Sequence, residues 1–566
     1  DINSGLRNNL DYNKVYNNSI DGILIHGSSK QSILSRNLIE NNTKYGISID
    51  GSCEINSLYK NLFIGNGIHA QDNQTSAISK NNWNTTKVGN YWDNITDTDN
   101  DNDGICDTVD YNIPGLAGAT DLEPIFGDPR FSGGMIHIDD SKASGDSWDW
   151  VSTRLWCSGA GIIQDPYIIE NLLINGTNSD SISSLKIGNS SKHFIIQNCN
   201  ITDSGTSSIY KDAGINFDNV TNGKIKSNWI YENYYGLYIK NSKNLEINKN
   251  NISLNTDDAF YARNCNESIS YENYILKSTG LGYYIYQCNN FSVLLNQIIE
   301  ADDTGLLVWE SANCNISYNN FYKCALEGIL LSVAENTTMY KNTILQNGYE
   351  GIEIRNSENN SVSFNTIRDN GEHGINLNRN SVSGGNKNKI LNNTIVFNNY
   401  SGIYVKGSTS YHLMDSRILG NNISYNGQAG TNDKERCGMY IEDYCDKNII
   451  LDNLISNNFA YGIGLDHRND ENLIVWNEVY NNSLDGIYLT MHTPGYNNSI
   501  VNNTVYLNKR HGIFIEYSLY QKIIGNEIYN NSVDGINLLS SDYSNITANT
   551  IYNNSNSPYA GVYFTT

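Results

Sequence analysis

Five aspartates stand at calcium-loop spacing between residues 99 and 110. Counted from the first of them, acids occupy positions 1, 3, 5, 9 and 12 and a glycine occupies position 6, which is the frame of an EF-type loop. Ca²⁺ takes six to eight oxygen ligands, and the glycine lets the chain turn sharply around the ion. A solvated acidic linker is the alternative, but it would not need that glycine. We expect a structural Ca²⁺ held by Asp99, Asp101, Asp103, the carbonyl of Ile105, Asp107 and Asp110.

A second set of polar residues, mostly acids, follows a spacing of 23 residues. Glu327, Glu350 and His373 each stand directly before a glycine, and the pairs Asp257–Asp258 and Asp302–Asp303 fall close to each other on the stack. Paired carboxyl groups can cleave glycosidic bonds, but no Asp-Pro-His motif and no arginine or lysine base accompanies these acids. Solvated edges of a repeat are the alternative, and the sequence favours it. We predict no catalytic residue, and the candidate residues for a sugar-binding groove are Asp257, Asp258, Asp303, Glu327, Glu350 and His373.

Several tyrosines could contact sugars, and several asparagines could carry glycans. Tyr283, Tyr284 and Tyr286 could stack on sugar rings, although tyrosine is also common on sheet surfaces. Asn-x-Ser/Thr sequons recur, and in so asparagine-rich a chain many arise by chance. The candidate glycosylation sites are Asn251, Asn315, Asn422 and Asn545.

The ten cysteines are scattered, which gives a zinc site little support. Cys265 and Cys288 are one spacing apart, close to disulfide range if they stack, with free buried thiols as an equal alternative. Cys437 and Cys445 form a weaker candidate pair. The neighbours His412 and Met414, and likewise Met491 and His492, have copper-ligand types, but such lone pairs are usually incidental.

These residues depend on a repeat that runs through most of the chain. Asparagines recur every 23 residues, each followed two residues later by an apolar residue, and a glycine followed by isoleucine or leucine comes further on. The asparagines are Asn250, Asn273, Asn296, Asn319, Asn342 and Asn365, and the glycines include Gly282, Gly305, Gly328, Gly351 and Gly374. A coil of three short strands cannot bury its apolar face alone, whereas stacked coils bury a continuous column. The spacing therefore predicts an all-β, right-handed parallel β-helix in which asparagines at the corners form ladders and adopt left-handed backbone.

The repeat also divides the chain. Asn13, Asn37 and Asn61 mark coils before residue 82, and the repeat then stops. We expect the final coils of a first β-helix at 1–81, a closing segment and acidic calcium linker at 82–132, a cap at 133–173, and a second β-helix of about 16 coils at 174–566. Wider glycine intervals predict loops near 383–388 and 424–436.

The repeats from Asn342 to Ile354, and Asn90-Tyr91-Trp92-Asp93 with its acidic continuation, resemble the NosD-like and CASH-type β-helix proteins of carbohydrate binding and sugar hydrolysis. The resemblance covers most of the chain and implies the β-helix fold. It leaves function open, because such families include lyases, epimerases, metal-associated periplasmic proteins and archaeal cell-surface proteins.

Composition limits the partners. The formal charge of −23 at pH 7 would repel phosphate backbones, so we expect no nucleic-acid partner. No apolar run approaches 18 residues, so we expect no transmembrane segment. The abrupt first and last coils have nearly continuous register, which predicts head-to-tail self-assembly, with an excerpt of a longer surface protein as the alternative. We therefore expect an extracellular, non-enzymatic filament or cell-surface component, and a polysaccharide-binding or polysaccharide-degrading protein as the alternative.

Overall fold

The computed structural model describes residues 1–101, 103–131, 133–142, 147–176, 182–381, 386–490, 497–554 and 560–565. The chain forms two compact units. The first comprises residues 1–174 and 186–199, and the second comprises residues 175–185 and 200–566. The segment 133–173 falls within the residue range of the first unit, and its role as a cap of the second β-helix stays a prediction.

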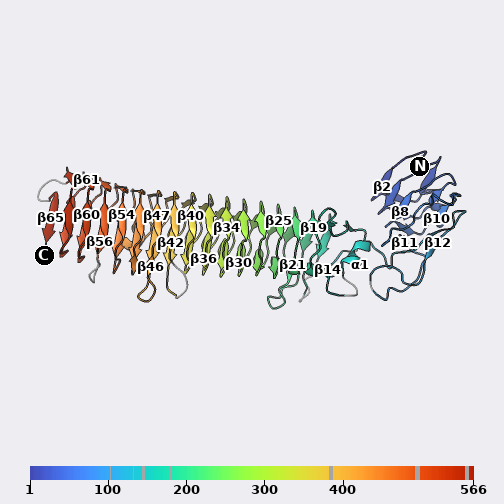
Figure 1. The fold of residues 1–566 in the computed structure, drawn as a ribbon, viewed down its shortest axis with the longest axis horizontal. Coiled ribbons are helices and arrows are strands. Elements are labelled where there is room, and N and C mark those ends of the chain that lie inside the picture. Colours follow the sequence, from blue (N-terminus) through green and yellow to red (C-terminus); the bar gives the residue numbers. More distant parts are fainter. Residues whose placement is uncertain are drawn as a thin grey trace. The chain divides into compact units, whose positions relative to one another are not determined.

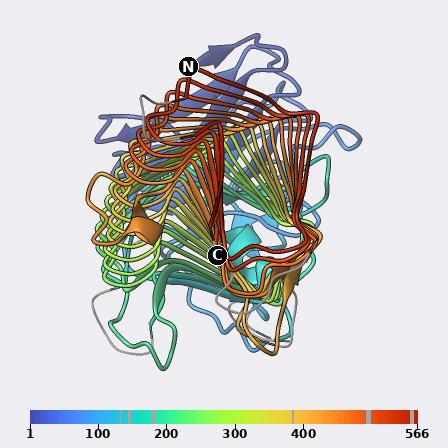
Figure 2. The ribbon, with the colours of Figure 1, turned by 90° about the vertical axis from the view of Figure 1, so that its left-hand side faces the viewer.

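The second unit is a parallel β-helix with three sheets, and its successive coils lie over one another (Figures 1 and 2). Each strand pairs in parallel with the strand one coil later. Within this unit, the second sheet runs from β22 (Gly223–Lys226) to β63 (Asn545–Thr547), and the third from β20 (Asn200–Thr202) to β64 (Thr550–Tyr552). The part of the first sheet in this unit consists of β21 (Ala213–Val220), β24 (Tyr235–Lys240), β27 (Phe260–Arg263), β30 (Tyr283–Tyr286), β33 (Leu306–Trp309), β36 (Ile329–Ser332), β39 (Ile352–Arg355), β42 (Ile375–Asn378), β45 (Ile403–Lys406), β49 (Met439–Glu442), β53 (Ile463–Asp466), β56 (Ile487–Thr490), β59 (Ile513–Glu516), β62 (Ile536–Leu539) and β65 (Val562–Thr565).

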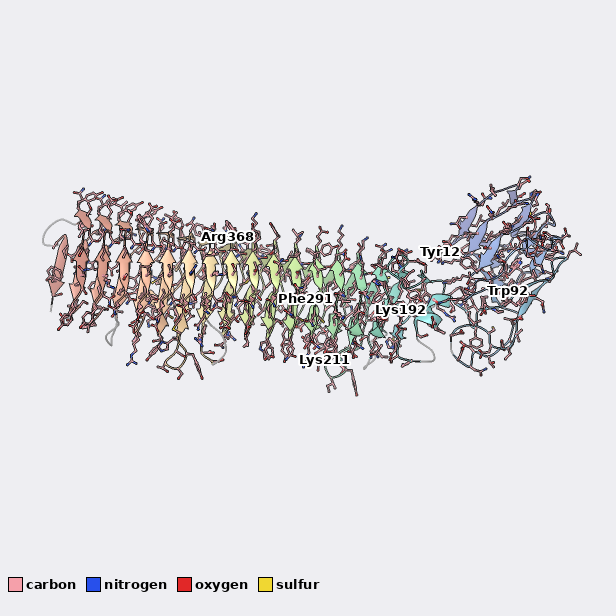
Figure 3. All side chains as sticks on the ribbon, in the orientation of Figure 1. Tyr12, Trp92, Lys192, Lys211, Phe291 and Arg368 are labelled. Atoms are coloured by element: carbon pink, nitrogen blue, oxygen red, sulfur yellow. The ribbon has the colours of Figure 1, made fainter. Side chains whose placement is uncertain are left out.

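Stacked apolar side chains fill the coils. The residues two places after the ladder asparagines pair coil to coil and are fully buried, which confirms the predicted inward column. The column contains Ile252, Ile275, Ile298, Phe321, Ile344 and Ile367. Burying each such side chain contributes about 1.5–3 kcal/mol. Phe291 also lies within the stack, whereas the charged ends of Lys211 and Arg368 point away from it (Figure 3).

The asparagine ladder is present. The Nδ2 of Asn296 donates to Oδ1 of Asn319 at 3.1 Å, and the Nδ2 of Asn319 donates to Oδ1 of Asn342 at 3.0 Å. The backbone N–H of each asparagine donates to the same oxygen, and Nδ2 of Asn319 also donates to the Val293 carbonyl at 2.8 Å. Each side chain thereby satisfies corner groups on neighbouring coils that would otherwise be buried without partners.

The left-handed corner residue is not the ladder asparagine, which corrects the expectation from the sequence. The residue just before it has positive φ instead, between 51° and 59°. These residues are Lys249, Glu272, Leu295, Tyr318, Lys341 and Phe364. These residue types vary because the turn leaves their side chains outside the stack. Left-handed backbone costs roughly 1–2 kcal/mol at a non-glycine residue, and the hydrogen bonds of the following asparagine offset that cost.

The repeated glycines have a different reason. Gly351 lies where a Cβ atom would stand 2.7 Å from the carbonyl oxygen of Gly374 and 2.4 Å from Cγ2 of Ile367. Gly328 meets its neighbours on the next coil, Gly351 and Ile344, in the same way. The next coil therefore comes too close for any side chain at this point of the turn.

Ladder bonds keep their length when a coil contains extra residues. Asn342 and Asn365 are 23 residues apart and bond at 3.0 Å, and Asn365 and Asn393 are 28 residues apart and also bond at 3.0 Å. Asn421 and Asn453, 32 residues apart, bond at 2.9 Å. The predicted loop at 424–436 holds a 3₁₀ turn, Asp433–Arg436, and the one at 383–388 falls partly outside the described residues.

The first unit contains its own short coil stack. Its parallel sheets include β1 (Ile2–Asn3), β4 (Ile23–His26), β7 (Tyr45–Ile49) and β10 (Ile68–Asp72), and β3 (Lys14–Tyr16), β6 (Leu38–Glu40), β9 (Leu62–Ile64) and β11 (Tyr91–Trp92). Because β11 pairs with β9, this stack extends past residue 81. Asn90 continues the ladder, and its N–H donates to the buried carboxyl of Asp121 at 2.7 Å. The unit also contains the antiparallel pair β12 (Tyr111–Ile113) and β13 (Ala119–Asp121), and α1 (Trp148–Thr153).

All ten cysteines are free, including the two candidate disulfide pairs. The N–H of Cys265 donates to Sγ of Cys288 at 3.2 Å, so the pair stacks as predicted but as thiols. Burial raises the pKa of most of these thiols, for example that of Cys324 to about 12, which leaves them unreactive. No helix in the described part of the chain is long and apolar enough to cross a membrane.

Candidate functional site

Aromatic side chains gather on the outward surface of the first sheet. At one register position, Tyr238, Tyr261 and Tyr284 pair with one another on β24, β27 and β30. Glycine–isoleucine alternation places these side chains outside, because the residues on either side of them point into the core. Farther along the sheet the same position holds Tyr404, Tyr440, Tyr488 and Phe514.

We define the aromatic platform as Tyr261, Tyr284, Tyr286 and Trp309. The rings of Tyr284 and Trp309 lie parallel with centroids 6.3 Å apart, and those of Tyr286 and Trp309 are 5.0 Å apart. The guanidinium of Arg263 lies 5.0 Å from the Tyr286 ring centre. Burial raises the pKa of Tyr284 to about 12, so its hydroxyl remains protonated. Tyr261 stands edge-on to Tyr284, at 84° between the ring planes. The platform therefore offers aromatic rings with hydroxyl groups at their edges, and Trp309 is 37% exposed.

Acidic side chains continue the same surface beyond the platform. We define the glutamate cluster as Glu327, Glu350, Glu353 and Glu372. Carboxylate oxygens of the first three all lie within 4.8 Å of one another, and Glu350 and Glu353 are 6% and 3% exposed. Burial raises the pKa of Glu350 to about 7, and the neighbouring charges of Glu372 and Glu327 act in the same direction. Glu350 can therefore hold or release a proton near neutral pH.

His373 follows Glu350 by one coil. Its ring stacks on that of Tyr404 with centroids 4.6 Å apart and 11° between the planes. Burial lowers the pKa of His373 to about 4, so the imidazole is neutral at pH 7. The 424–436 insertion lies close by, since Oγ of Ser401 donates to the carbonyl of Lys434 at 2.6 Å.

A second group of acids farther along the sheet has cationic partners. Nζ of Lys434 lies 2.5 Å from Glu442 and 3.0 Å from Asp466, and Nζ of Lys406 lies 3.3 Å from Glu442. The hydroxyl of Tyr440 donates to Asp466 at 3.0 Å. Gly464 leaves room for the Tyr440 ring, whose Cδ2 would otherwise lie 2.6 Å from a Cβ. These lysines neutralise the acids around them.

The six residues predicted for a sugar groove all belong to the turns that lead into the first sheet. Glu350 and His373 stack as the spacing predicts, since the N–H of Gly351 donates to the His373 carbonyl at 3.0 Å. Asp257, Asp258 and Asp303 form a separate acidic group. Burial raises the pKa of Asp258 to about 7, and the neighbouring charge of Asp257 acts in the same direction.

Sequence reasoning placed one residue wrongly and missed others. Tyr283 is completely buried and its hydroxyl lies 2.8 Å from that of Ser270, so it cannot stack on a sugar. Glu353, Glu372 and Asn376 were not anticipated. Glu353 could have been found from the period-two rule, because it stands one place after the inward Ile352.

The predicted calcium loop of the first unit brings three of its carboxylates together. Oxygens of Asp99, Asp101 and Asp107 lie within 4.8 Å of one another. The N–H groups of Asp103 and Gly104 donate to Asp99 at 3.0 Å each, and Gly104 has a φ of 89°. Asp110 is not among these three, and Asp97, at the loop's edge, accepts from the N–H groups of Thr108 and Val109 at 2.9 Å each.

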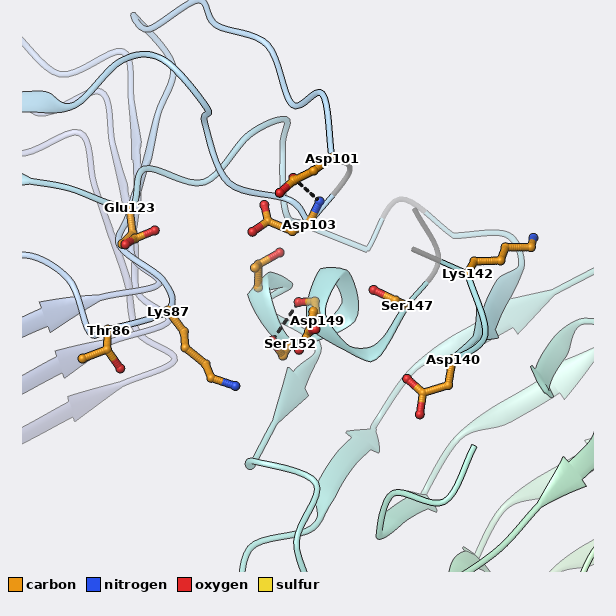
Figure 4. A pocket seen from close by; sticks show the side chains of 11 residues that line it. Thr86, Lys87, Asp101, Asp103, Glu123, Asp140, Lys142, Ser147, Asp149 and Ser152 are labelled. Atoms are coloured by element: carbon orange, nitrogen blue, oxygen red, sulfur yellow. Dashed lines mark hydrogen bonds between the residues drawn. The ribbon is translucent and has the colours of Figure 1, made fainter. Parts of the chain in front are cut away.

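A pocket of about 450 Å³ lies beside this loop within the first unit (Figure 4). Asp101, Asp103, Glu123 and Asp149 line it together with Lys87. Most of its charged groups are acidic, so it favours a cation over an anion.

The candidate glycosylation sites lie at the surface. Asn251, Asn315 and Asn545 are exposed at the starts of their strands, and Asn422 is half-buried. Their positions permit modification, which stays a prediction.

Two family models match the sequence. A family described as "Right handed beta helix region" matches residues 169–309 and 304–475. A family described as "Periplasmic copper-binding protein (NosD)" matches residues 2–96 and 430–566. Among curated proteins, none matches.

Solved structures with some likeness include three β-helix proteins. The mannuronan C-5 epimerase AlgE6 A-module of Azotobacter vinelandii is 12% identical, over 66% of this chain and 91% of its own, with a TM-score of 0.41. PfbA, a surface adhesin of Streptococcus pneumoniae, is 15% identical over 57% and 84%, and the Dettilon tailspike protein is 13% identical over 56% and 62%, each with a TM-score of 0.31. At these values the likeness carries no functional information.

The copper-ligand candidates His412 and Met414 lie just before and on the short strand next to Asp446. Nδ1 of His412 lies 2.6 Å from Asp446, and Met414 follows on the same short strand, β46 (Leu413–Met414). No group of three histidine, cysteine or carboxylate ligands gathers around His412 in the described residues. Met491 and His492 lie outside the described residues.

Proposed function

Because the chain belongs to the family of right-handed β-helix regions, whose stacked coils present one continuous outer surface, we propose that it binds an extended polysaccharide along the first sheet. The aromatic platform carries this proposal. Aromatic rings with hydroxyl edges at the surface of the sheet suit the apolar faces and hydroxyl groups of sugars. Glu353 of the glutamate cluster has the same register position in the first sheet as Tyr284 of the platform, three strands farther along, so one chain can contact both.

The charge of the surface indicates the class of polysaccharide. The glutamate cluster and the Asp257, Asp258 and Asp303 group accept hydrogen bonds from hydroxyls, whereas they repel carboxylates and sulfates. In the absence of a bound cation we therefore expect neutral polysaccharides to bind better than acidic ones. The proposed location is outside the cytoplasm, which agrees with the periplasmic description of the second matching family.

The experiment is a binding panel of neutral and acidic polysaccharides, measured by affinity electrophoresis and calorimetry. Removal of two rings, Tyr261→Ala with Tyr284→Ala, should weaken binding at least about tenfold, since each stacked ring contributes on the order of 1 kcal/mol. Reducing-sugar release is measured in parallel and separates binding from cleavage.

A matched control removes tyrosines from another face. Tyr506 and Tyr529 stack with centroids 4.9 Å apart on β58 (Thr504–Tyr506) and β61 (Glu527–Tyr529) of the third sheet. Tyr506→Ala with Tyr529→Ala should leave binding unchanged. Equal loss in both double variants, or no binding of any polysaccharide by the parent protein, would contradict the proposal.

The acidic loop of the first unit is proposed to bind a structural Ca²⁺ through Asp99, Asp101 and Asp107, with Asp103 and the Ile105 carbonyl nearby. Three convergent carboxylates and a left-handed glycine support this assignment. End-to-end stacking of copies stays a prediction from the register of the repeats, and electron microscopy of the purified protein tests it.

A further inference from the structure

The glutamate cluster has the geometry of a cation site. Oxygens of Glu327, Glu350 and Glu353 approach within 4.8 Å of one another. Ca²⁺ binds oxygens at 2.3–2.6 Å, so ligands on opposite sides of one ion are separated by about 5 Å. Glu327 and Glu350 come from successive turns and Glu353 from β39, so the fold, rather than one flexible loop, sets their spacing.

A buried amide oxygen beside the cluster lacks a donor. Asn376, on β42, is 9% exposed, and its Nδ2 donates to Oε1 of Glu350 at 3.0 Å. Its Oδ1 accepts no hydrogen bond from any described residue. A buried unsatisfied oxygen costs about 1–3 kcal/mol, and an amide oxygen is a normal Ca²⁺ ligand. A cation held between Asn376 and the carboxylates would remove that cost.

The charge of the cluster is also poorly balanced. Among the described residues, Arg355 is the only cationic group paired with it, through Glu353, with Nη2 2.7 Å and Nε 3.0 Å from the carboxylate. Glu327, Glu350 and Glu372 have no such partner in the described part of the chain. By contrast, the acids at Glu442 and Asp466 face Lys434 and Lys406. The two groups share the same sheet, yet the glutamate cluster alone has negative charge left for an ion.

We propose that Glu327, Glu350 and Glu353, with Oδ1 of Asn376, bind a hard divalent cation of the Ca²⁺ class. All the ligand atoms are oxygens, which favour Ca²⁺, Mg²⁺ or Mn²⁺ over copper or zinc, and the irregular set of three acids and an amide suits the relaxed geometry of Ca²⁺. This site is distinct from the acidic loop of the first unit. The same cluster accepts hydrogen bonds from sugar hydroxyls in the polysaccharide proposal, but its Ca²⁺ binding does not depend on that proposal.

The test is calorimetric titration of the full chain with CaCl₂, in a background where Asp99→Asn and Asp101→Asn remove the loop carboxylates. The background protein should still bind one Ca²⁺. Adding Glu350→Gln and Glu353→Gln should abolish that binding, and adding Asn376→Leu should weaken it about tenfold or more.

Arg355→Gln is the variant that controls for folding. Because the arginine competes for Glu353, its removal should tighten Ca²⁺ binding, whereas general damage to the fold would weaken it. Retention of Ca²⁺ binding by the Glu350→Gln, Glu353→Gln protein would overturn the proposal. So would a background protein that binds no Ca²⁺ while its thermal unfolding matches that of the parent.

Discussion

Asn319 shows how one residue supports three coils. Its Oδ1 accepts from the N–H and the Nδ2 of Asn296, and its own Nδ2 donates to Asn342 and to the carbonyl of Val293. The residue is 1% exposed, so water cannot replace these bonds. A buried polar group left without a partner costs more than the hydrogen bond itself contributes. The ladder is therefore sensitive to the loss of any single member.

Asn319→Ala should lower the free energy of unfolding by about 2–3 kcal/mol, because it leaves donors of Asn296 and the Val293 carbonyl unsatisfied. Urea unfolding followed by circular dichroism measures the change. Asn399→Ala is the control, since Asn399 is exposed and, among the described residues, only its backbone makes hydrogen bonds; it should change stability by less than about 0.5 kcal/mol. Equal stability of Asn319→Ala and the parent would mean that water replaces the ladder bonds.

The turn into the first sheet is the element that brings neighbouring coils closest. Glycines recur there although their φ values are not positive, because the carbonyl of the next coil occupies the place of a side chain. The acids that form the glutamate cluster precede two of these glycines. The close approach of coils at this turn thus also brings the carboxylates of Glu327 and Glu350 together.

Gly351→Ala should destabilise the second unit by about 1–3 kcal/mol, since the added methyl would lie 2.4 Å from Ile367 and 2.7 Å from Gly374. Gly561 has the same place in the repeat, but its nearest neighbour would be 3.7 Å away. Gly561→Ala should therefore be neutral. Thermal unfolding of both variants tests this, and similar melting temperatures would show that the coil can separate at little cost.

Over the whole molecule, buried acids lower the free energy of unfolding as the pH rises. Burial raises the pKa values of Asp121, Asp258, Glu350 and Asp485 to about 7. In the folded protein these groups keep a proton that the unfolded chain loses near pH 4, so they reduce stability as pH rises from about 4 to 7. Burial lowers the pKa values of two histidines, His373 and His511, to about 4. Because the unfolded chain protonates them below about pH 6.5 and the folded protein does not, these histidines raise the free energy of unfolding as the pH rises from about 4 to 6.5.

Asp485→Asn should raise the free energy of unfolding at pH 8 by about 1–2 kcal/mol in calcium-free buffer, because the amide keeps the acceptor for the His511 N–H without a buried charge. Arg510, 3.4 Å from the carboxylate, reduces the gain. The difference should be small at pH 4.5, and exposed Asp452→Asn should show none at either pH. A variant less stable than the parent at pH 8 would mean that the Arg510 pair outweighs burial.

The parts of the fold that repeat could be predicted from the sequence, and the parts that do not repeat could not. Asn296, Asn319 and their equivalents specify the ladder, and the isoleucines two places later specify the core, because stacked coils need equivalent residues at equal intervals. Tyr283 points inward because it directly follows Gly282 and so takes the place that isoleucine has in the other repeats. Asn376 was missed because its role depends on contacts between coils that no single repeat contains.

The unequal coil lengths have a consequence for how such a protein diversifies. Intervals of 23, 28 and 32 residues leave ladder bonds of 2.9–3.0 Å, so segments at the corners can be lengthened without altering the interior. A recognition loop could be transplanted to any equivalent corner, and whole turns could be duplicated to lengthen the surface. Evolvability is thus confined to the perimeter of each turn, while the interior stays the same.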